Sequence, residues 1–344
     1  MSFPSAKIKL ILFFLLSACI NQAQAQAETQ NQMKKQMKKQ LHIIIPGGAG
    51  GGWDTTARSV GEALSRTGIV GNTSYENLSG GDGSKAIAHL IETADRQANT
   101  LMITSTPIIL RSLKNIFPQS YKDLTPIATV IADYGAFVVR ADSPYKTWND
   151  VIKDAKKHPR KVNVAGGSAK GSMDHVVAAL AYKKSGLDPK SLKYIPYNAG
   201  AKALVGLLSG ETQVLSTGLS EVLALAQQGE VRILASTAPK RIVAAPNVAT
   251  LKELNIDMEF TNWRGFFAAP KMNDSQIKEF HQVLEAMYKR PEWQKIRMSR
   301  GWNDLYIKGE DFKIFLAQQE KELTALLKEL GFYPAKITAV SEEV

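Results

Sequence analysis

The sequence predicts an α/β protein. From Leu41 onward, short apolar runs alternate with segments whose apolar residues recur at helical spacing, which is typical of α/β folds. Ile43, Ile44 and Ile45 form a β-branched run without polar alternation, as in a strand that is covered on both faces. Glycine-rich turns follow several of these runs, directly before a predicted helix. Strand, glycine turn and helix in that order indicate sheets flanked by helices.

The composition is that of a globular protein with two domains. The chain has 344 residues, of which 44% are hydrophobic and 22% are charged. Part of its net charge of +11 comes from the first forty residues, which hold six lysines and one glutamate, so the rest carries 37 basic against 31 acidic side chains. This mild excess favours an anionic ligand or a membrane surface. Nucleic acid is not predicted as a partner, because no basic stripe with interleaved aromatic residues occurs.

The N-terminal segment predicts export. An apolar run at 10–18 follows two lysines and has the length of a signal-sequence core, too short to span a membrane. Two processing sites compete: AQA at 23–25 fits signal peptidase, and LSAC at 16–19 resembles a bacterial lipobox. We favour the lipobox, because a polar tether follows it, and we expect lipidation at Cys19. Cys19 is the only cysteine, so the folded part has no disulfide and no cysteine-based site.

The first glycine turn lies between the isoleucine strand and a helix. Asp54 is the predicted N-cap of this helix, whose apolar residues follow at helical spacing. Glycines let backbone amides approach a ligand, and a helix N-terminus adds unpaired amides and a positive dipole. The turn therefore predicts an anion site, with a flexible connector as the alternative, and it is not a P-loop because no Gly-Lys-Ser/Thr follows. The glycines of this turn are Gly47, Gly48, Gly50, Gly51 and Gly52.

A second glycine turn, at 79–83, precedes a helix over 84–94 in the same way. The next strand, at 101–104, ends in Ser105 and Thr106. Ligands of open α/β sheets bind at the carboxyl ends of the strands, so both hydroxyl groups are candidate contacts.

The second half of the chain repeats this pattern. A strand at 137–140 marks the change of domain, and a strand at 162–165 leads into the turn at 166–171, with Ser172 as the predicted N-cap of the next helix. Glycine turns at helix starts in both domains indicate a protein that closes on its ligand. The later predicted elements are a strand at 194–197 followed by Asn198 and Ala199, a helix ending at Gly210, a strand ending in Gly218, a short helix capped by Ser220, a strand at 231–235, a helix within 247–254, a return strand at 260–270, and helices from Asp274 to about residue 330.

These segments, in this order, resemble the extracytoplasmic solute receptors of tripartite tricarboxylate transporters, also called Bug-type receptors. The Gly-Trp-Asp and Asn-Trp-Arg-Gly forms look most like the tricarboxylate branch. Departures occur at Ser79-Gly80-Gly81-Asp82 and at Lys170, where the family usually has uncharged residues. The motifs that carry the resemblance are PGGAGGGWDTTAR at 46–58, ENLSGGDGS at 76–84, FVVRADSPYKTWNDV at 137–151, GGSAKGSMDH at 166–175, YIPYNAGAKALVGLLSG at 194–210, GEVRILA at 229–235 and NWRGFFAAP at 262–270.

The resemblance implies a two-lobed periplasmic-binding-protein (Venus flytrap) fold, in which each lobe is a mixed sheet flanked by helices and a hinge joins the lobes. We expect residues 1–40 to be signal sequence and tether, 41–139 with 262–344 to form lobe 1, and 140–261 to form lobe 2. The implied function is capture of an organic carboxylate, citrate-like by preference, in the periplasm of a Gram-negative bacterium. The implied partner is a membrane permease, and the protein is expected to be a monomer without cofactor.

Mapped by motif, the resemblance implies two groups of ligand contacts. Asp54 and Asp174 are expected to cap or brace loops, since an acid repels an anion unless the ligand offers a hydroxyl or amine group. Gly52→Val is expected to abolish binding and to leave the fold largely intact. The implied contacts are Gly51, Gly52, Trp53, Asp54 and Thr55 in lobe 1 and Ser168, Ser172, Asp174 and His175 in lobe 2, and the strand ends and turns add Gly81, Ser105, Thr106, Gly171, Asn198, Ala199 and Gly218.

Other functions have weaker support in the sequence. An exported hydrolase would need a nucleophile beside its base, but no G-x-S-x-G motif occurs and adjacent Asp174 and His175 point to different sides of a helix. The five histidines show no paired metal-ligand spacing, so no metal site is predicted. Trp263 and Arg264 fit either ligand contacts or core positions. A receptor that presents its ligand to a sensor kinase remains an alternative to transport.

Overall fold

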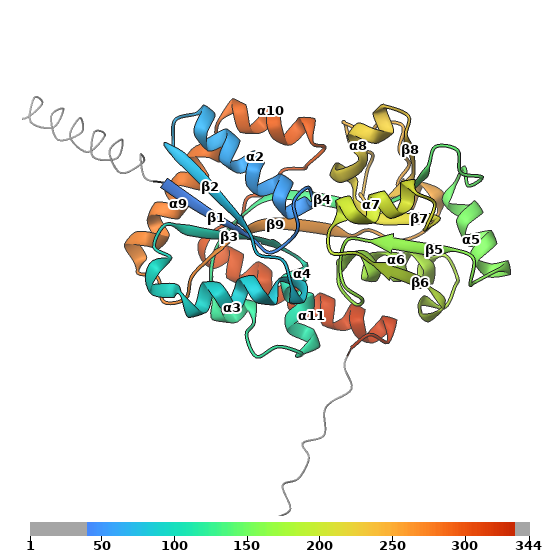
Figure 1. Ribbon diagram of the computed structural model, residues 1–344, viewed down its shortest axis with the longest axis horizontal. Helices are drawn as coiled ribbons and strands as arrows, with labels where there is room; N and C mark the ends of the chain where they lie inside the picture. The colour runs from blue at the N-terminus through green and yellow to red at the C-terminus, as the bar shows by residue number, and fades with distance from the viewer. Residues whose placement is uncertain (1–39, 334–344) are drawn as a thin grey trace, which may run out of the picture.

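The computed structural model describes residues 40–333, which form two lobes lying side by side (Figure 1). In this part of the chain nine strands form one mixed sheet, in the order β2-β1-β3-β9-β4-β7-β5-β6, with β8 also paired to β4. The predicted α/β class is confirmed. The strands are β1 (Gln40–Ile45), β2 (Asn72–Asn77), β3 (Thr100–Ser105), β4 (Thr125–Arg140), β5 (Asn163–Gly166), β6 (Lys193–Pro196), β7 (Val214–Gly218), β8 (Val231–Ser236) and β9 (Thr261–Ala268).

Helices flank the sheet in both lobes (Figure 1). Lobe 1 carries α2, α3, α4, α9 and α10, and lobe 2 carries α5 to α8. The helices are α2 (Gly52–Arg66), α3 (Ser84–Glu92), α4 (Pro107–Lys114), α5 (Trp148–Lys157), α6 (Met173–Lys184), α7 (Gly200–Leu208), α8 (Leu219–Gln227), α9 (Asp274–Tyr288), α10 (Pro291–Ser299) and α11 (Gly309–Leu330).

Each lobe combines parallel and antiparallel pairing. In lobe 1, β1 pairs in parallel with β2 and β3, and β9 runs antiparallel to β3. In lobe 2, β5 pairs in parallel with β6 and β7, and β4 runs antiparallel to β7 and β8. The glycine turns therefore follow the carboxyl ends of the parallel strands in both lobes.

Strand β4 joins the lobes without a break. Up to Tyr134 it pairs with β9, and from Gly135 onward it pairs with β7 and β8. The chain returns between Phe260 and Thr261, where β9 begins. The lobe boundaries at 139/140 and 261/262 stay a prediction, because a continuous strand crosses the first of them.

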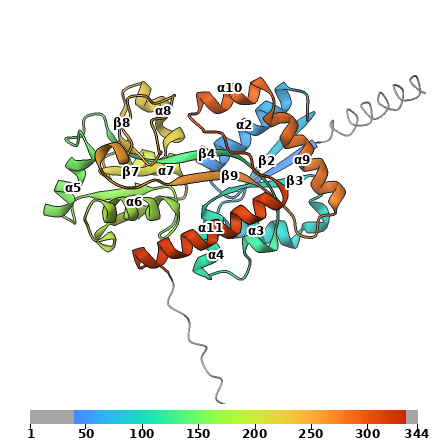
Figure 2. The ribbon, with the colours of Figure 1, turned by 180° about the vertical axis from the view of Figure 1, so that it is seen from behind.

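Helix α11 lies across both lobes, as Figure 2 shows. It packs against α4 and β4 and, near its end, against α6 of lobe 2. Glu329 forms an ion pair with Lys183 at 3.1 Å, and Phe332 stacks on His175 with ring centroids 4.7 Å apart. The last turn of α11 therefore contacts lobe 2, although its sequence falls in the predicted lobe 1.

Strand β1 confirms the prediction from the isoleucine run. Ile43, Ile44 and Ile45 are all fully buried. Ile44 belongs to the apolar cluster beneath α3 and α4, and Ile43 and Ile45 belong to the cluster beneath α2 and α9. Alternate side chains thus enter two different cores, which is why no polar residue interrupts the run.

Three helices begin at residues other than those predicted. The predicted caps Asp54 and Ser220 are wrong, and Asp274, taken as the cap of α9, is instead its first residue. Ser220 donates instead to Asp133, with 2.6 Å between the Oγ and Oδ2 atoms. The observed N-caps are Gly51 for α2, Gly218 for α8 and Asn273 for α9.

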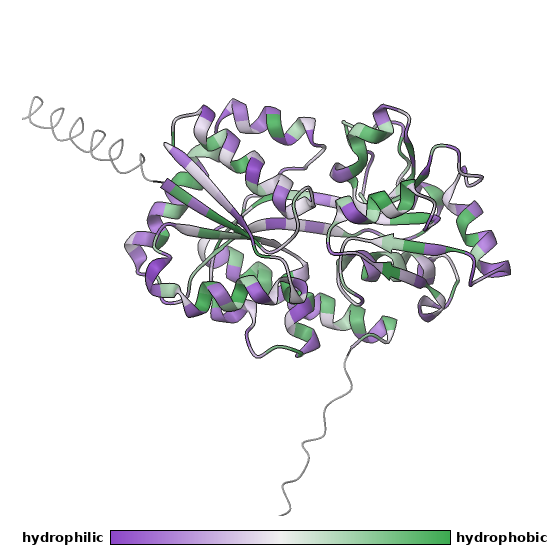
Figure 3. Cartoon of the chain, viewed as in Figure 1, coloured by the Kyte–Doolittle hydropathy of each residue, from purple (hydrophilic) through white to green (hydrophobic). Residues whose placement is uncertain are grey.

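Several elements lacked a clear signal in the sequence. β2 is a polar edge strand, which Figure 3 shows in mostly hydrophilic colours, so it carries no apolar run. α4 begins at Pro107, directly after the strand end at Ser105. β4 extends much further toward the N-terminus than the predicted strand at 137–140. The helix predicted within 247–254 is only a 3-10 turn, Lys252–Leu254.

Candidate functional site

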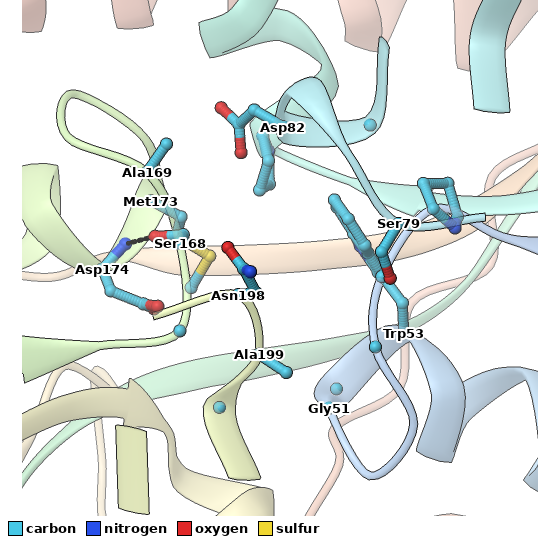
Figure 4. A pocket seen from close by; sticks show the side chains of 18 of the residues that line it. Gly51, Trp53, Ser79, Asp82, Ser168, Ala169, Met173, Asp174, Asn198 and Ala199 are labelled. Carbon is cyan, nitrogen blue, oxygen red and sulfur yellow. Dashed lines mark hydrogen bonds between the residues drawn. The ribbon is translucent and has the colours of Figure 1, made fainter. Parts of the chain in front are cut away.

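A cavity of about 590 Å³ lies between the two lobes (Figure 4). Lobe 1 lines it with the turns before α2 and α3 and with the end of β3. Lobe 2 lines it with the turns before α6 and α7 and with one side chain of α8, and β9 adds two side chains. Both predicted glycine turns of lobe 1 and the turn at 166–171 of lobe 2 therefore meet at one site.

The turn before α2 brings backbone amides to this cavity. Gly51 is the N-cap of α2, and no side chain caps the helix. The first-turn amides of a helix have no partner within the helix, so they are available to an anion. A Cβ at Gly47 would lie 3.1 Å from the Trp53 ring, so the absence of a side chain lets the turn pass close to the indole. Trp53 is fixed in turn, since its Nε1 donates to Ser105 Oγ at 2.8 Å.

Asp54 braces this turn and does not line the cavity. Its carboxylate accepts hydrogen bonds from the Gly50 amide at 3.0 Å, from Arg58 at 2.9 Å and from Asn77 at 3.1 Å. Burial raises the pKa of Asp54, but these hydrogen bonds outweigh burial and hold the pKa below its ordinary value. The carboxylate therefore stays charged as a structural acceptor, as expected for a brace.

The turn before α3 has an unusual backbone. Gly80, Gly81 and Gly83 have positive φ angles, as does Asp82 with φ of 55°. Positive φ strains a residue with a side chain, so Asp82 is held there by its surroundings. Its carboxylate faces the cavity and pairs with Lys114 of α4 at 3.5 Å. The acid that departs from the usual family pattern thus lies in the site.

In lobe 2, Ser168 organises the start of α6. Its Oγ accepts from the Asp174 amide at 3.0 Å, and its carbonyl accepts from Tyr194 at 2.7 Å. Ser172 is the N-cap residue by position, as predicted, but its hydroxyl caps nothing and is fully buried. Asp174 lines the cavity (Figure 4), and burial raises its pKa to about 6.

His175 has a structural role away from the cavity. Its Nδ1 accepts from the Gly171 amide at 2.8 Å, so the ring proton lies on Nε2. The ring packs between Tyr194 and Phe332. Burial, together with Lys170 and Lys114, lowers its pKa to about 4, which keeps it neutral.

Arg264 forms a buried polar network beneath the cavity. Its Nη2 donates to Asp133 Oδ2 at 2.7 Å, and its Nη1 donates to the Gly52 carbonyl and to Thr56, both at 2.9 Å. Glu221 of α8 lies 3.6 Å from the same Nη2 and lines the cavity. Burial raises the pKa of Glu221 to about 7, although Arg264 lowers it. Arg264 thus joins the α2 start of lobe 1 to an acid of lobe 2.

This network corrects one expectation. A Cβ at Gly52 would lie 2.4 Å from Arg264 Nη2, and Arg264 is only 2% exposed. Gly52→Val should therefore displace a buried ion pair, so we expect it to lower the stability of the fold as well as to remove binding. Trp263, the other half of the Trp-Arg motif, is a core residue that packs edge-on against Phe312 and Phe315.

The predicted contacts divide into two groups. Asp54, Thr55, Thr106, Gly171, Ser172, His175 and Gly218 do not line the cavity; they brace turns, begin helices or pack in the core. The predicted residues that line it are Gly51, Gly52, Trp53, Gly81, Ser105, Ser168, Asp174, Asn198 and Ala199.

The sequence analysis did not name Glu221 or Asn262 as site residues. It left Arg264 open between a ligand contact and a core position. Asn262 and Arg264 are alternate residues of β9, so they share one face of the strand. The usable signal was the polar pair itself, since a strand with Asn and Arg on one face needs a polar environment.

The described residues contain neither a candidate metal cluster nor a helix that could span a membrane. Between residues 40 and 333, no group of three or more His, Cys, Asp or Glu side chains is placed to hold a metal ion. Within the same range, every helix lacks the combination of length and apolar character that a membrane span requires. The predicted signal sequence and the predicted lipidation site at Cys19 lie outside the described residues.

Comparison with known proteins agrees with the resemblance. The family model described as "Tripartite tricarboxylate transporter family receptor" matches residues 57–332. A UPF0065 protein in the gbd 5′ region of Cupriavidus necator is 26% identical over 299 residues, which cover 86% of this chain and 89% of the relative.

Two solved structures illustrate the shared fold. MatC from Rhodopseudomonas palustris, with bound malate, has a TM-score of 0.72 and 19% identity, and covers 85% of this chain and 98% of its own. R. palustris Rpa4515, with adipate, has a TM-score of 0.77 and 21% identity, with 86% and 98% covered. The predicted two-lobed periplasmic-binding-protein fold is confirmed. Because the family model spans most of the described residues, the chain belongs to the tripartite tricarboxylate transporter receptor family, whose members are extracytoplasmic solute-binding proteins.

Proposed function

We propose that this protein captures a small organic carboxylate between its lobes and delivers it to the permease of a tripartite tricarboxylate transporter. The observation that carries the proposal is the start of α2, which no side chain caps and which opens into a cavity lined by both lobes. Each charge-assisted hydrogen bond from such amides to a carboxylate contributes about 1.5–3 kcal/mol. Malate and adipate in two similar structures support the carboxylate class.

The Gly-Trp-Asp motif at Trp53 and the Asn-Trp-Arg-Gly motif at Trp263 favour a citrate-like tricarboxylate as the ligand. The cavity of about 590 Å³ has the size of a small-molecule site, so citrate fits by volume. Three acidic side chains, Asp82, Asp174 and Glu221, also line the cavity. Citrate therefore has to bind with protons or with its hydroxyl group directed at an acid.

A thermal-shift screen of the mature protein against citrate and a panel of di- and monocarboxylates tests the proposal. A ligand at a hundred times its dissociation constant adds about 2.7 kcal/mol of stability, which raises the melting temperature by several degrees. Failure of every carboxylate to stabilise the protein would contradict the proposal. For a ligand that binds, growth on it should be lost when the permease genes are deleted; retained uptake with lost gene induction would instead indicate a sensor-kinase partner.

Lys114 forms a direct contact across the cleft. Its Nζ donates to the Lys170 carbonyl of lobe 2 at 3.0 Å, while Asp82 pairs with it on the lobe 1 side. The two lobes also touch at the glycine turn, where a Cβ at Gly50 would lie 3.3 Å from that of Ala201. We propose that these contacts belong to the closed, ligand-bound arrangement.

Lys114→Met should weaken binding of the identified ligand by about three- to tenfold, because one inter-lobe hydrogen bond of about 0.5–1.5 kcal/mol is lost from the closed form alone. Calorimetry measures the affinity, and small-angle scattering measures whether the ligand still reduces the radius of gyration. Lys122→Met is the matched control, since Lys122 pairs with Glu320 outside the cleft. Equal affinities of both variants would show that the contact does not contribute to closure.

A further inference from the structure

The charged groups around the cavity are not balanced. Asp82 has Lys114 as its partner at 3.5 Å, and Arg264 has Asp133 at 2.7 Å. Asp174 forms no ion pair with any lysine, arginine or histidine of the described residues. The cation paired with Glu221 is Arg264, whose Nη2 lies 3.6 Å from Oε1 and already donates to Asp133. Asp174 therefore faces the cavity without a cation, Glu221 shares Arg264 with Asp133, and Lys170, which also lines the cavity, forms no ion pair with either acid.

Three glycines surround the carboxylate of Glu221, and a side chain at any of them would collide with it. A Cβ at Gly200 would lie 2.1 Å from Glu221 Oε2, and a Cβ at Gly52 or at Gly218 would lie 2.9 or 2.8 Å from Oε1. The starts of α2, α7 and α8 thus converge on this carboxylate. A protein acid already holds the deep anion position, so a second carboxylate from a ligand would be repelled there.

Asn262 provides a third hydrogen-bond acceptor in the wall of the cavity. Asn262 is 4% exposed and lines the cavity, and its Oδ1 has no hydrogen-bond partner among the described residues. It lies on the same face of β9 as Arg264, whose Nη2 is 3.6 Å from Glu221, and both Asn262 and Glu221 line the cavity. A buried acceptor without a donor is costly, so this wall of the cavity calls for a ligand that donates.

We propose that the ligand is a zwitterion, with a carboxylate at the glycine turn of α2 and a protonated amine at Asp174, Glu221 and Asn262. This inference rests on the proposed function and narrows the substrate class to amino-substituted carboxylic acids. A protonated primary amine has three N–H donors and one positive charge. It matches three acceptors, two of which are carboxyl groups whose ionised forms its positive charge favours. A hydroxyl group donates only once and brings no charge, and a citrate trianion adds charge of the wrong sign.

Calorimetry with matched acids tests the inference, because each pair differs only in the amine: succinate and aspartate, glutarate and glutamate, adipate and 2-aminoadipate, with citrate alongside. We expect at least one amino acid to bind about tenfold or more tightly than its unsubstituted partner and more tightly than citrate. Tighter binding of citrate or of every unsubstituted acid would overturn the inference and leave the proposed function standing. Absence of binding by all of these acids would overturn both.

Glu221→Gln and Asp174→Asn should change the affinities for an amino acid and for its unsubstituted partner in opposite directions. Removing either negative charge should weaken the amino acid by about tenfold or more and strengthen the unsubstituted dicarboxylate. Glu230→Gln is the matched control, because Glu230 is an exposed acid of the same lobe outside the cavity. Equal weakening of both ligands by a folded variant would contradict the inference. If one variant fails to fold in thermal unfolding, the other variant and the matched acids still decide.

Discussion

Replacing Arg264 with methionine should lower the free energy of unfolding by about 3–5 kcal/mol and remove ligand binding, because it leaves Asp133 as a buried charge without its partner. Arg264 is 2% exposed and Asp133 is fully buried, with 2.7 Å between Nη2 and Oδ2. The same change removes the donors to the Gly52 carbonyl and to Thr56. The start of α2 would lose its support, and the glycine turn would lose its position.

Urea denaturation measures this effect, and an exposed arginine provides the control. Arg241 forms an ion pair with Glu253 at 3.0 Å on the surface, so Arg241→Met should cost no more than about 1 kcal/mol. The double variant Arg264→Met, Asp133→Asn should recover part of the loss, since no unpaired charge is left buried. An Arg264→Met variant as stable as the Arg241→Met control would show that the buried pair does not stabilise the fold.

The sequence predicted most of the fold because most helices and strands carry a recognisable pattern within their own residues. The isoleucines of β1 and Gly210, which follows α7, give a strand and a helix end directly. Edge strand β2 gave no signal, because one of its faces and its outer edge are solvated. Local capping also misled: an Asp or Ser near a helix start resembles an N-cap, but tertiary partners such as Arg58 or Asp133 can claim its side chain.

The sequence predicted which backbone turns line the cavity, but it did not predict how the charged side chains are arranged there. Glycine turns are local, so the turns at Gly51, Gly81 and Ser168 were found and they do line one cavity. The contact between Arg264 and Gly52 joins residues 212 positions apart, and no spacing rule reaches that far. His175 shows the converse error, since its motif position implied a contact while its ring packs on Phe332. Which residue of a motif faces the ligand depends on packing that the motif does not contain.

Gly51→Val should weaken ligand binding by about thirty-fold or more, equivalent to about 2 kcal/mol, and should reduce stability by only about 1 kcal/mol. Gly51 has φ of −80°, which any residue adopts, and a Cβ there would meet no atom closer than 3.4 Å. Its nearest neighbours across the cleft are Ala199 and the Gly200 amide, both at 3.9 Å. A Cβ therefore fits at this position, and the branches of valine occupy the space between the lobes where a carboxylate would reach the α2 amides.

Gly52→Val is the informative companion to this variant, because the two glycines are adjacent and differ in what lies beside them. At Gly52 the new side chain meets the guanidinium of Arg264, so both stability and binding should fall, stability by about 3 kcal/mol or more through overpacking and the broken pair. Calorimetry for affinity and urea denaturation for stability separate the two cases. A folded Gly51→Val protein that binds as tightly as the parent would place the ligand away from this turn. Two variants with the same loss of stability would mean that Gly51, like Gly52, supports the buried network and not the ligand.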